Sequence, residues 1–412
     1  MNNSLIWQRN ILTNGLRFLY LPRPYANTAQ LSVAIEYGSN SEIEIEAGSA
    51  HFLEHLLAGG SEERIQKSRS IENYGGSLNF YTDHEFTLSF ADVLPESLPK
   101  TAQTLSELLF DNTFDEEKLI SERKIILHEL AEDSDDPTTI IDELLLKNLF
   151  KTHPVRRPIG GYPKTLNKLT LHQLQTIHTN AYKPQNMILI LMGNLSKAQI
   201  QKILKPFEDK SQQQKISKQF HSQKNSKMCK KISKNKQGIT QTYLNIGTKT
   251  VNAKNEDTHK LDLIRMILSG GASSRLFIEL REKNTLTYDV TVTHCKGIDF
   301  GYLNIGCAVK NSNVNKTQKL IFNELAKLQT EKISEEELER NKKLVLSGIL
   351  RGIDNSDTCQ DILAYMEIQY NHEKALINYI DKIKAITTSD ILTVSQKYLQ
   401  KDDFITAILK PK

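Results

Sequence analysis

Residues 50–58 read AHFLEHLLA, a run in which apolar residues at helical spacing surround two histidines and one glutamate. Side chains four residues apart lie on the same face of an α-helix, so this run predicts a helix on which His51 and His55 can bind one metal ion. Glu54 follows His51 by three residues and can reach a water molecule beside that ion. The H-x-x-E-H order is the reverse of the commoner H-E-x-x-H motif of zinc proteases. We therefore predict a zinc site with Glu54 as its general base.

A catalytic zinc ion needs a third protein ligand and an open fourth position. Residues 114–133, FDEEKLISERKIILHELAED, have the spacing of one amphipathic helix and carry Glu122 and Glu129 seven residues apart, on the same face. We predict Glu129 as the third ligand and Glu122 as a carboxylate that orients a ligand without binding the metal. His128 adjoins Glu129 but points about 100° away on a helix, so it is expected to be exposed or packed.

The segments around these motifs indicate a duplicated α+β fold. Upstream, Asn14-Gly15 separates two short strand-like runs, as in a tight hairpin. Residues 77–83 and 85–93 alternate apolar and polar side chains and predict a second hairpin. In the second half, residues 389–409 match residues 171–191 in kind at an offset of about 217. This recurrence indicates two copies of one α+β unit.

A lysine-rich segment separates the two halves. Residues 210–236 contain nine lysines and no acidic residue, which is typical of a solvated linker. The segment lacks the interleaved aromatic residues that bind single-stranded nucleic acid. The predicted organisation is therefore a zinc-binding catalytic domain at 1–208, a linker at 209–238 and a second domain at 239–412.

The composition limits the class of protein further. A chain of 412 residues with 39% hydrophobic residues is long enough for two cores, and its net charge of +4 argues against a general nucleic-acid binder. The N-terminal residues lack the pattern of a signal or transit peptide, and no apolar stretch is long enough to cross a bilayer. We expect a cytoplasmic protein that does not bind membranes, with reduced cysteines and no C-x-x-C pair for zinc or redox chemistry: Cys229, Cys295, Cys307 and Cys359.

These motifs resemble those of a known family. H-x-x-E-H, followed by the second glutamate of an E-x6-E pair, is similar to the pitrilysin/insulinase family of inverted-motif zinc peptidases. Residues 269–290, SGGASSRLFIELREKNTLTYDV, resemble the family segment whose arginine and tyrosine reach over the substrate, here Arg281 and Tyr288. The length and the duplication resemble the short branch that includes the mitochondrial processing peptidase subunits and their bacterial relatives.

The resemblance implies a fold and an assembly. Each domain would hold a mostly antiparallel sheet with helices on one side, and two chains would close around a chamber. The zinc helix of one chain would then meet Arg281 and Tyr288 of its partner. A homodimer is expected because one sequence carries both halves of the site, and a heterodimer with a homologous chain is the alternative.

The resemblance also implies how a peptide binds. Residues 75–83, GGSLNFYTD, resemble an edge strand that pairs with the substrate, so Asn79 is expected to face the peptide. Phe80 occupies a position where the family has a small alanine, so a narrower subsite is expected. Residues 56–64, LLAGGSEER, replace an aromatic-x-Gly-Thr segment, so the zinc helix is expected to end differently.

The function that follows is a zinc-dependent metalloendopeptidase for short or unfolded peptides, with one zinc ion per chain. Glu54 would move the proton, Tyr288 would stabilise the oxyanion and Arg281 would hold a substrate carbonyl. Two alternatives are a presequence-type processing peptidase and a non-catalytic structural subunit of the same family. A structural subunit would be expected to lack a zinc ligand or the base, and this chain has all four residues.

Overall fold

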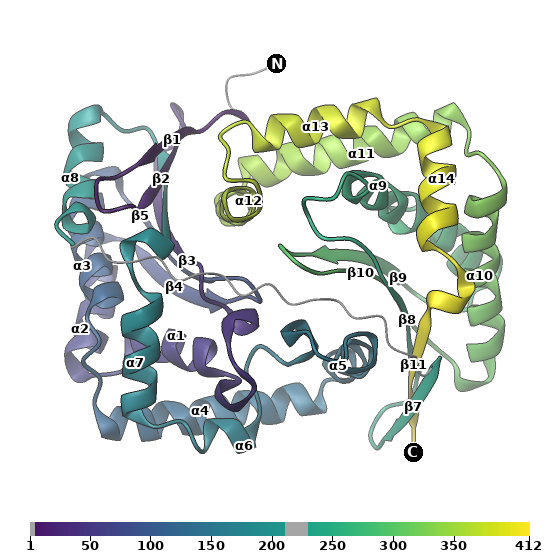
Figure 1. Cartoon of the computed structure of the whole chain (residues 1–412), viewed down its shortest axis with the longest axis horizontal. Coiled ribbons are helices and arrows are strands. Elements are labelled where there is room, and N and C mark those ends of the chain that lie inside the picture. The colour runs from purple at the N-terminus through teal and green to yellow at the C-terminus, as the bar shows by residue number, and fades with distance from the viewer. Residues whose placement is uncertain (1–4, 211–229) are drawn as a thin grey trace. The chain divides into compact units, whose positions relative to one another are not determined.

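The computed structural model describes residues 5–210 and 230–412, and the chain divides into two compact units (Figure 1). Within the described residues, the first unit comprises 5–131, 157–210 and 352–376. The second unit comprises 132–156, 230–351 and 377–412. Each unit therefore contains a segment from the other half of the sequence.

The first unit is built on a six-stranded sheet in the order β1-β2-β6-β3-β5-β4. Its strands are β1 (Gln8–Ile11), β2 (Arg17–Pro22), β3 (Ala29–Ile35), β4 (Ser77–Thr82), β5 (Thr87–Val93) and β6 (Met187–Gly193). Apart from the β2–β6 pair, neighbouring strands are antiparallel. Gly15, with φ +87°, forms the predicted turn between β1 and β2. Strand β4 ends the sheet, so its outer edge pairs with no other strand of the described residues.

Helices cover both faces of this sheet. One face packs on helices that include α1 (Ser49–Gly59), α3 (Leu98–Phe110), α7 (Leu171–Ala181) and α8 (Lys197–Glu208). The core there joins Leu31 and Val33 of β3 to Phe52 and Leu56 of α1, all with no exposed surface. The opposite face meets α12 (Ser356–Tyr370), where the Ser32 hydroxyl donates to Gln360 Oε1 at 2.6 Å.

The second unit repeats this plan with a five-stranded sheet in the order β7-β11-β8-β10-β9. Its strands are β7 (Lys231–Lys236), β8 (Thr242–Lys249), β9 (Val290–Lys296), β10 (Gly301–Val309) and β11 (Ile405–Pro411). The β7–β11 pair is parallel and the others are antiparallel. Helices α9 (Thr258–Ser269), α10 (Val314–Thr330) and α14 (Thr388–Tyr398) contribute to the core on one face. Helix α5 (Pro137–Leu149) packs closely on the other, where a Cβ at Gly247 would come 2.7 Å from Leu145.

The predicted duplicated α+β fold is confirmed, because the two sheets have the same strand order apart from the additional β1, and each contains one parallel pair. The exchange of α5 and α12 between the halves was not predicted from the sequence. Strand β7 occupies the end of the segment predicted as a linker, and residues 211–229, including Cys229, lie outside the described residues. The predicted boundaries near 208 and 239 stay a prediction.

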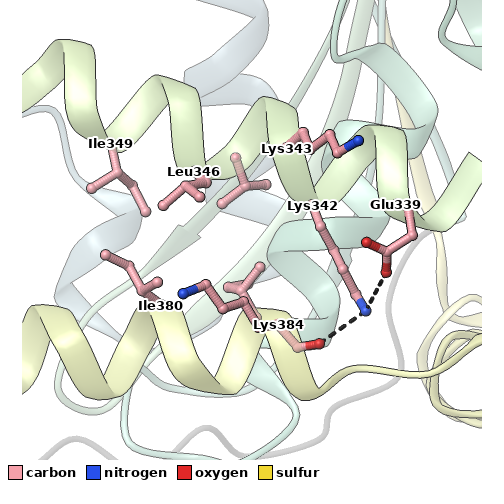
Figure 2. Close-up of a pocket in the computed structure, with 9 residues that line it drawn as sticks. Glu339, Lys342, Lys343, Leu346, Ile349, Ile380 and Lys384 are labelled. Atoms are coloured by element: carbon pink, nitrogen blue, oxygen red, sulfur yellow. Dashed lines mark hydrogen bonds and ion pairs between the residues drawn. The ribbon is translucent and has the colours of Figure 1, made fainter. Parts of the chain in front are cut away.

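A cavity of about 180 Å³ opens in the second unit between α11 (Glu335–Asp354) and α13 (Ala375–Ala385) (Figure 2). Aliphatic side chains from both helices line it, with three lysines and Glu339 beside them. Its lining contains no histidine or cysteine and a single carboxylate, so it is unsuited to a zinc ion. Among the described residues, no helix has both the length and the apolar character needed to cross a lipid bilayer.

Candidate metal centre

Helix α1 positions the residues of the H-x-x-E-H motif. Phe52, Leu53 and Leu56 are fully buried and fix the rotation of the helix against the sheet. The helix begins after Gly48, where the Glu42 carboxylate accepts the backbone N–H groups of Gly48 at 3.0 Å and Ala50 at 2.8 Å. These contacts satisfy donors that the first turn of a helix leaves unpaired. The side chains of His51, Glu54 and His55 are therefore left partly exposed at the edge of the core.

Helix α4 (Glu116–Asp135) brings Glu129 to the two histidines. Glu129 Oε2 lies 3.8 Å from His51 Nε2 and 3.4 Å from His55 Nε2. One ligand atom from each of the three residues lies within 4.8 Å of the others. The two imidazole rings are nearly perpendicular, with centroids 4.8 Å apart. Two imidazole nitrogens and one carboxylate oxygen that converge at this spacing fit the ligand set of a catalytic zinc ion.

Glu122 lies behind His55 and away from the convergent atoms. Its Oε2 is 3.1 Å from His55 Nδ1, so it can accept a hydrogen bond from the Nδ1–H group. This bond leaves Nε2 of His55 directed at Glu129. Gly59 makes room for this carboxylate, because a Cβ there would lie 2.4 Å from Glu122 Oε1. The arrangement matches the orienting role expected for Glu122, and the role itself stays a prediction.

The environment shifts the pKa values of the motif residues. Burial, followed by the neighbouring His55, lowers the pKa of His51 to about 4, so its ring is neutral near pH 7 and keeps a lone pair for a metal ion. Burial lowers the pKa of His55, but the hydrogen bond that His55 donates to Glu122 and the charge of Glu129 outweigh it, and the net shift is upward. Burial raises the pKa of Glu54, although a hydrogen bond from Thr82 opposes that shift.

Glu54 is held by the edge strand rather than by the predicted metal ligands. The Thr82 hydroxyl of β4 donates to Glu54 Oε2 at 2.7 Å. Phe80 shares this face of β4 and packs against the core of the first unit. Asn79 lies on the opposite face, which it shares with Tyr81, and the Tyr81 hydroxyl donates to Asp361 of α12. Thr82 was missing from the predicted site because its contact with Glu54 joins segments that are distant in sequence.

The remaining predicted residues belong to the second unit. Arg281 lies in a π-helical turn, η8 (Phe277–Lys283), and its guanidinium carbon is 4.5 Å from the centroid of the Tyr288 ring. The Tyr288 side chain is largely exposed. The structure brings these two residues together, and their action on the metal centre stays a prediction. His128 is exposed, as expected.

The segment after the motif ends α1 at Gly59. Ser61 begins the next helix, α2 (Glu62–Ser70), by accepting the backbone N–H of Arg64 at 3.2 Å. The tight Gly59-Gly60-Ser61 connection therefore joins α1 directly to α2.

Family models identify the class of protein that this fold and site define. The model described as "Insulinase (Peptidase family M16)" matches residues 17–163, and "Peptidase M16 inactive domain" matches residues 168–345. The chain belongs to peptidase family M16, the pitrilysin/insulinase family, as its motifs predicted.

Relatives and solved structures agree over nearly the whole chain. An uncharacterised zinc protease of Rickettsia felis is 29% identical over 97% of this chain and 93% of its own length. The uncharacterised zinc protease YmxG of Bacillus subtilis is 26% identical over 98% of both chains. A crystal structure of a protease from Helicobacter pylori has a TM-score of 0.88 at 21% identity, covering 98% of this chain and 99% of that one. A peptidase M16 inactive domain from Pseudomonas fluorescens has a TM-score of 0.89 at 19% identity over 98% of each chain.

Proposed function

We propose that this protein is a zinc-dependent metalloendopeptidase that hydrolyses short or unfolded peptides. The observation that carries the proposal is the convergence of His51, His55 and Glu129 beside a separately held Glu54. Three ligands with an open fourth position are typical of a catalytic rather than a structural zinc site.

The side chains around this centre have different roles in the proposed reaction. A zinc ion bound to His51, His55 and Glu129 would polarise the scissile carbonyl and make an attacking water more acidic. Glu54 takes the proton of that water and passes it to the leaving amine, and its raised pKa suits a group that both accepts and releases a proton. Tyr288 and Arg281 are proposed to stabilise the oxyanion and to hold a substrate carbonyl.

The open edge of β4 supports an extended peptide as the substrate. Backbone groups on such an edge can pair with a peptide strand and give affinity with little dependence on side chains. A folded protein does not offer a free extended strand, so short or unfolded chains are favoured. Phe80, on the same face of β4 as Thr82, is proposed to narrow the adjacent subsite.

We propose a homodimer as the working assembly, because one chain carries both the metal ligands and the Arg281–Tyr288 pair. A heterodimer with a homologous chain is the alternative. Native mass measurement of the purified chain should give twice the monomer mass, and a strictly monomeric but active protein would contradict the shared site.

A cytoplasmic location is proposed from the cysteine spacing, and cell fractionation checks it.

The non-catalytic alternative is the second candidate. A chain of Complex III2 from Candida albicans shares this fold at a TM-score of 0.81 and 16% identity. The present chain keeps two histidines and a carboxylate that converge, together with Glu54 in the same motif, and a purely structural subunit does not need these residues. A peptidase that processes presequences is the other alternative, and it would be a more specific version of the proposed activity.

Removal of the metal tests the proposal. Hydrolysis of an unfolded peptide should be lost after treatment with a chelator and restored by adding zinc, because the three convergent ligands would hold an exchangeable ion. A compactly folded protein of similar sequence composition should not be cleaved. Hydrolysis that survives complete removal of the metal would contradict the proposed mechanism.

A further inference from the structure

Arg281 is held by aromatic rings instead of by acceptor groups. Its guanidinium carbon lies 4.7 Å from the ring centroid of Phe277 and 4.5 Å from that of Tyr288. Within residues 5–210 and 230–412, the guanidinium makes no hydrogen bond or ion pair. By contrast, Arg275 donates to both carboxylate oxygens of Glu337, at 2.8 and 2.7 Å.

The backbone explains how the two rings reach one arginine. Leu276 and Leu280 are fully buried and anchor the π-helical turn η8 to the core of the second unit. The turn closes with a hydrogen bond from the backbone N–H of Leu286 to Leu280 O at 2.8 Å. Between them, Thr285 has φ +48°, a left-handed conformation that is costly for a β-branched residue. This reversal returns the chain so that Tyr288 lies against Arg281.

Cation–π contacts restrain the position of an arginine without using its donors. The five N–H donors of Arg281 therefore stay available for an acceptor that comes from outside the chain. Tyr288, at 82% exposure, is open to the same acceptor. Phe277 is half-buried against the core, so its ring is held in place more firmly than the side chains of Arg281 and Tyr288.

We propose that Phe277 is a positioning residue that holds Arg281 beside Tyr288 and directs its N–H groups at a carbonyl oxygen of the peptide backbone. This inference rests on the proposed peptidase function. It adds Phe277 and the strained Thr285 turn to the residues that determine substrate binding in the second unit.

Variants at Phe277 test the role of the ring. Phe277→Leu should raise KM about 3–10-fold with kcat nearly unchanged, because a contact made equally in the ground and transition states acts on binding. Phe277→Tyr keeps an aromatic face and should retain the wild-type KM. Phe322→Leu is the matched control, since Phe322 has a lysine above its ring elsewhere in the second unit, and its KM should not change. An unchanged KM in Phe277→Leu would overturn the proposal.

A second readout does not depend on activity. NMR of selectively labelled arginine should show the Arg281 side-chain protons shifted upfield by the two rings. The shift should shrink in Phe277→Leu and persist in Phe277→Tyr. Tyr288→Leu removes an exposed ring with little risk to folding and should cause a partial loss. Unshifted Arg281 protons in the wild-type protein would overturn the stacking even if peptide hydrolysis is confirmed. If the Arg281 protons are shifted as expected but no peptide is hydrolysed, the stacking would be confirmed and the proposed peptidase function would be wrong.

Discussion

Glu54→Gln is expected to bind zinc at the wild-type level and to lose peptide hydrolysis by about 10²–10⁴-fold, the usual cost of losing a general base. Its carboxylate is absent from the convergent ligand set and accepts a hydrogen bond from Thr82. The glutamine amide has the same shape and can still accept that hydrogen bond, so the site should keep its structure. Steady-state kinetics combined with metal analysis measures both properties.

Glu63→Gln is the matched control for this substitution. Glu63 lies on α2 and pairs with Lys67 at the surface, so its loss should leave both zinc content and hydrolysis unchanged. A Glu54→Gln protein without zinc would show that Glu54 is a ligand. A fully active Glu54→Gln protein would show that Glu54 is not the general base.

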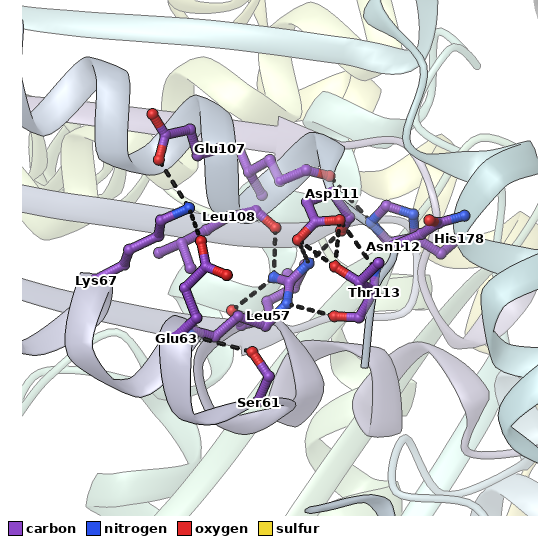
Figure 3. Close-up of polar contacts among 12 residues, drawn as sticks. Leu57, Ser61, Glu63, Lys67, Glu107, Leu108, Asp111, Asn112, Thr113 and His178 are labelled. Atoms are coloured by element: carbon purple, nitrogen blue, oxygen red, sulfur yellow. Dashed lines mark hydrogen bonds and ion pairs between the residues drawn. The ribbon is translucent and has the colours of Figure 1, made fainter. Parts of the chain in front are cut away.

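Arg64→Met is expected to destabilise the chain by about 3–5 kcal/mol, as for removal of one partner from a buried polar network. Arg64 is 2% exposed, and its guanidinium donates to the carbonyl oxygens of Leu57, Leu108, Asp111 and Thr113 (Figure 3). Methionine fills a similar volume but leaves these buried acceptors without a donor. Denaturant unfolding monitored by circular dichroism measures the loss.

The contact with Leu57 connects Arg64 to the helix of the candidate metal centre, because Leu57 belongs to the last turn of α1. Arg69→Met, at an exposed position in the last turn of α2, is the control and should change stability by less than about 0.5 kcal/mol. A loss below about 1 kcal/mol in Arg64→Met would mean that water replaces the missing donors.

The convergence of His51, His55 and Glu129 could be predicted from the sequence because the spacing of these residues is local. His51 and His55 need only one turn of helix to converge, and Glu122 and Glu129 need two turns of another. The structure then shows how the two helices meet, through the buried faces of α1 and α4 in one core. Thr82, Gly59 and Arg64 were not found, since their roles depend on contacts between segments that are far apart in the chain.

The exchanged helices were missed for a similar reason, although β3 contained a signal. Gln30 and Ser32 alternate with apolar Leu31 and Val33, yet both polar residues are buried. A buried polar face on a strand requires a partner that can form hydrogen bonds. That partner is α12, which lies in the second half of the sequence. The hairpins, by contrast, were predicted correctly because an Asn-Gly or Asp-His turn acts between adjacent strands.

We propose that His51, His55 and Glu129 together bind one zinc ion. Metal content per chain, measured after dialysis against metal-free buffer, tests it most directly in three proteins: wild type, Glu129→Gln and Glu117→Gln. Glu117 is an exposed residue in the first turn of the same helix. We expect about one zinc ion in the wild type and in Glu117→Gln, and a large loss in Glu129→Gln, whose neutral amide is a poor zinc ligand. Full zinc content in Glu129→Gln would indicate that Glu122, and not Glu129, is the third ligand. A wild-type chain that binds no zinc would contradict the proposed zinc site.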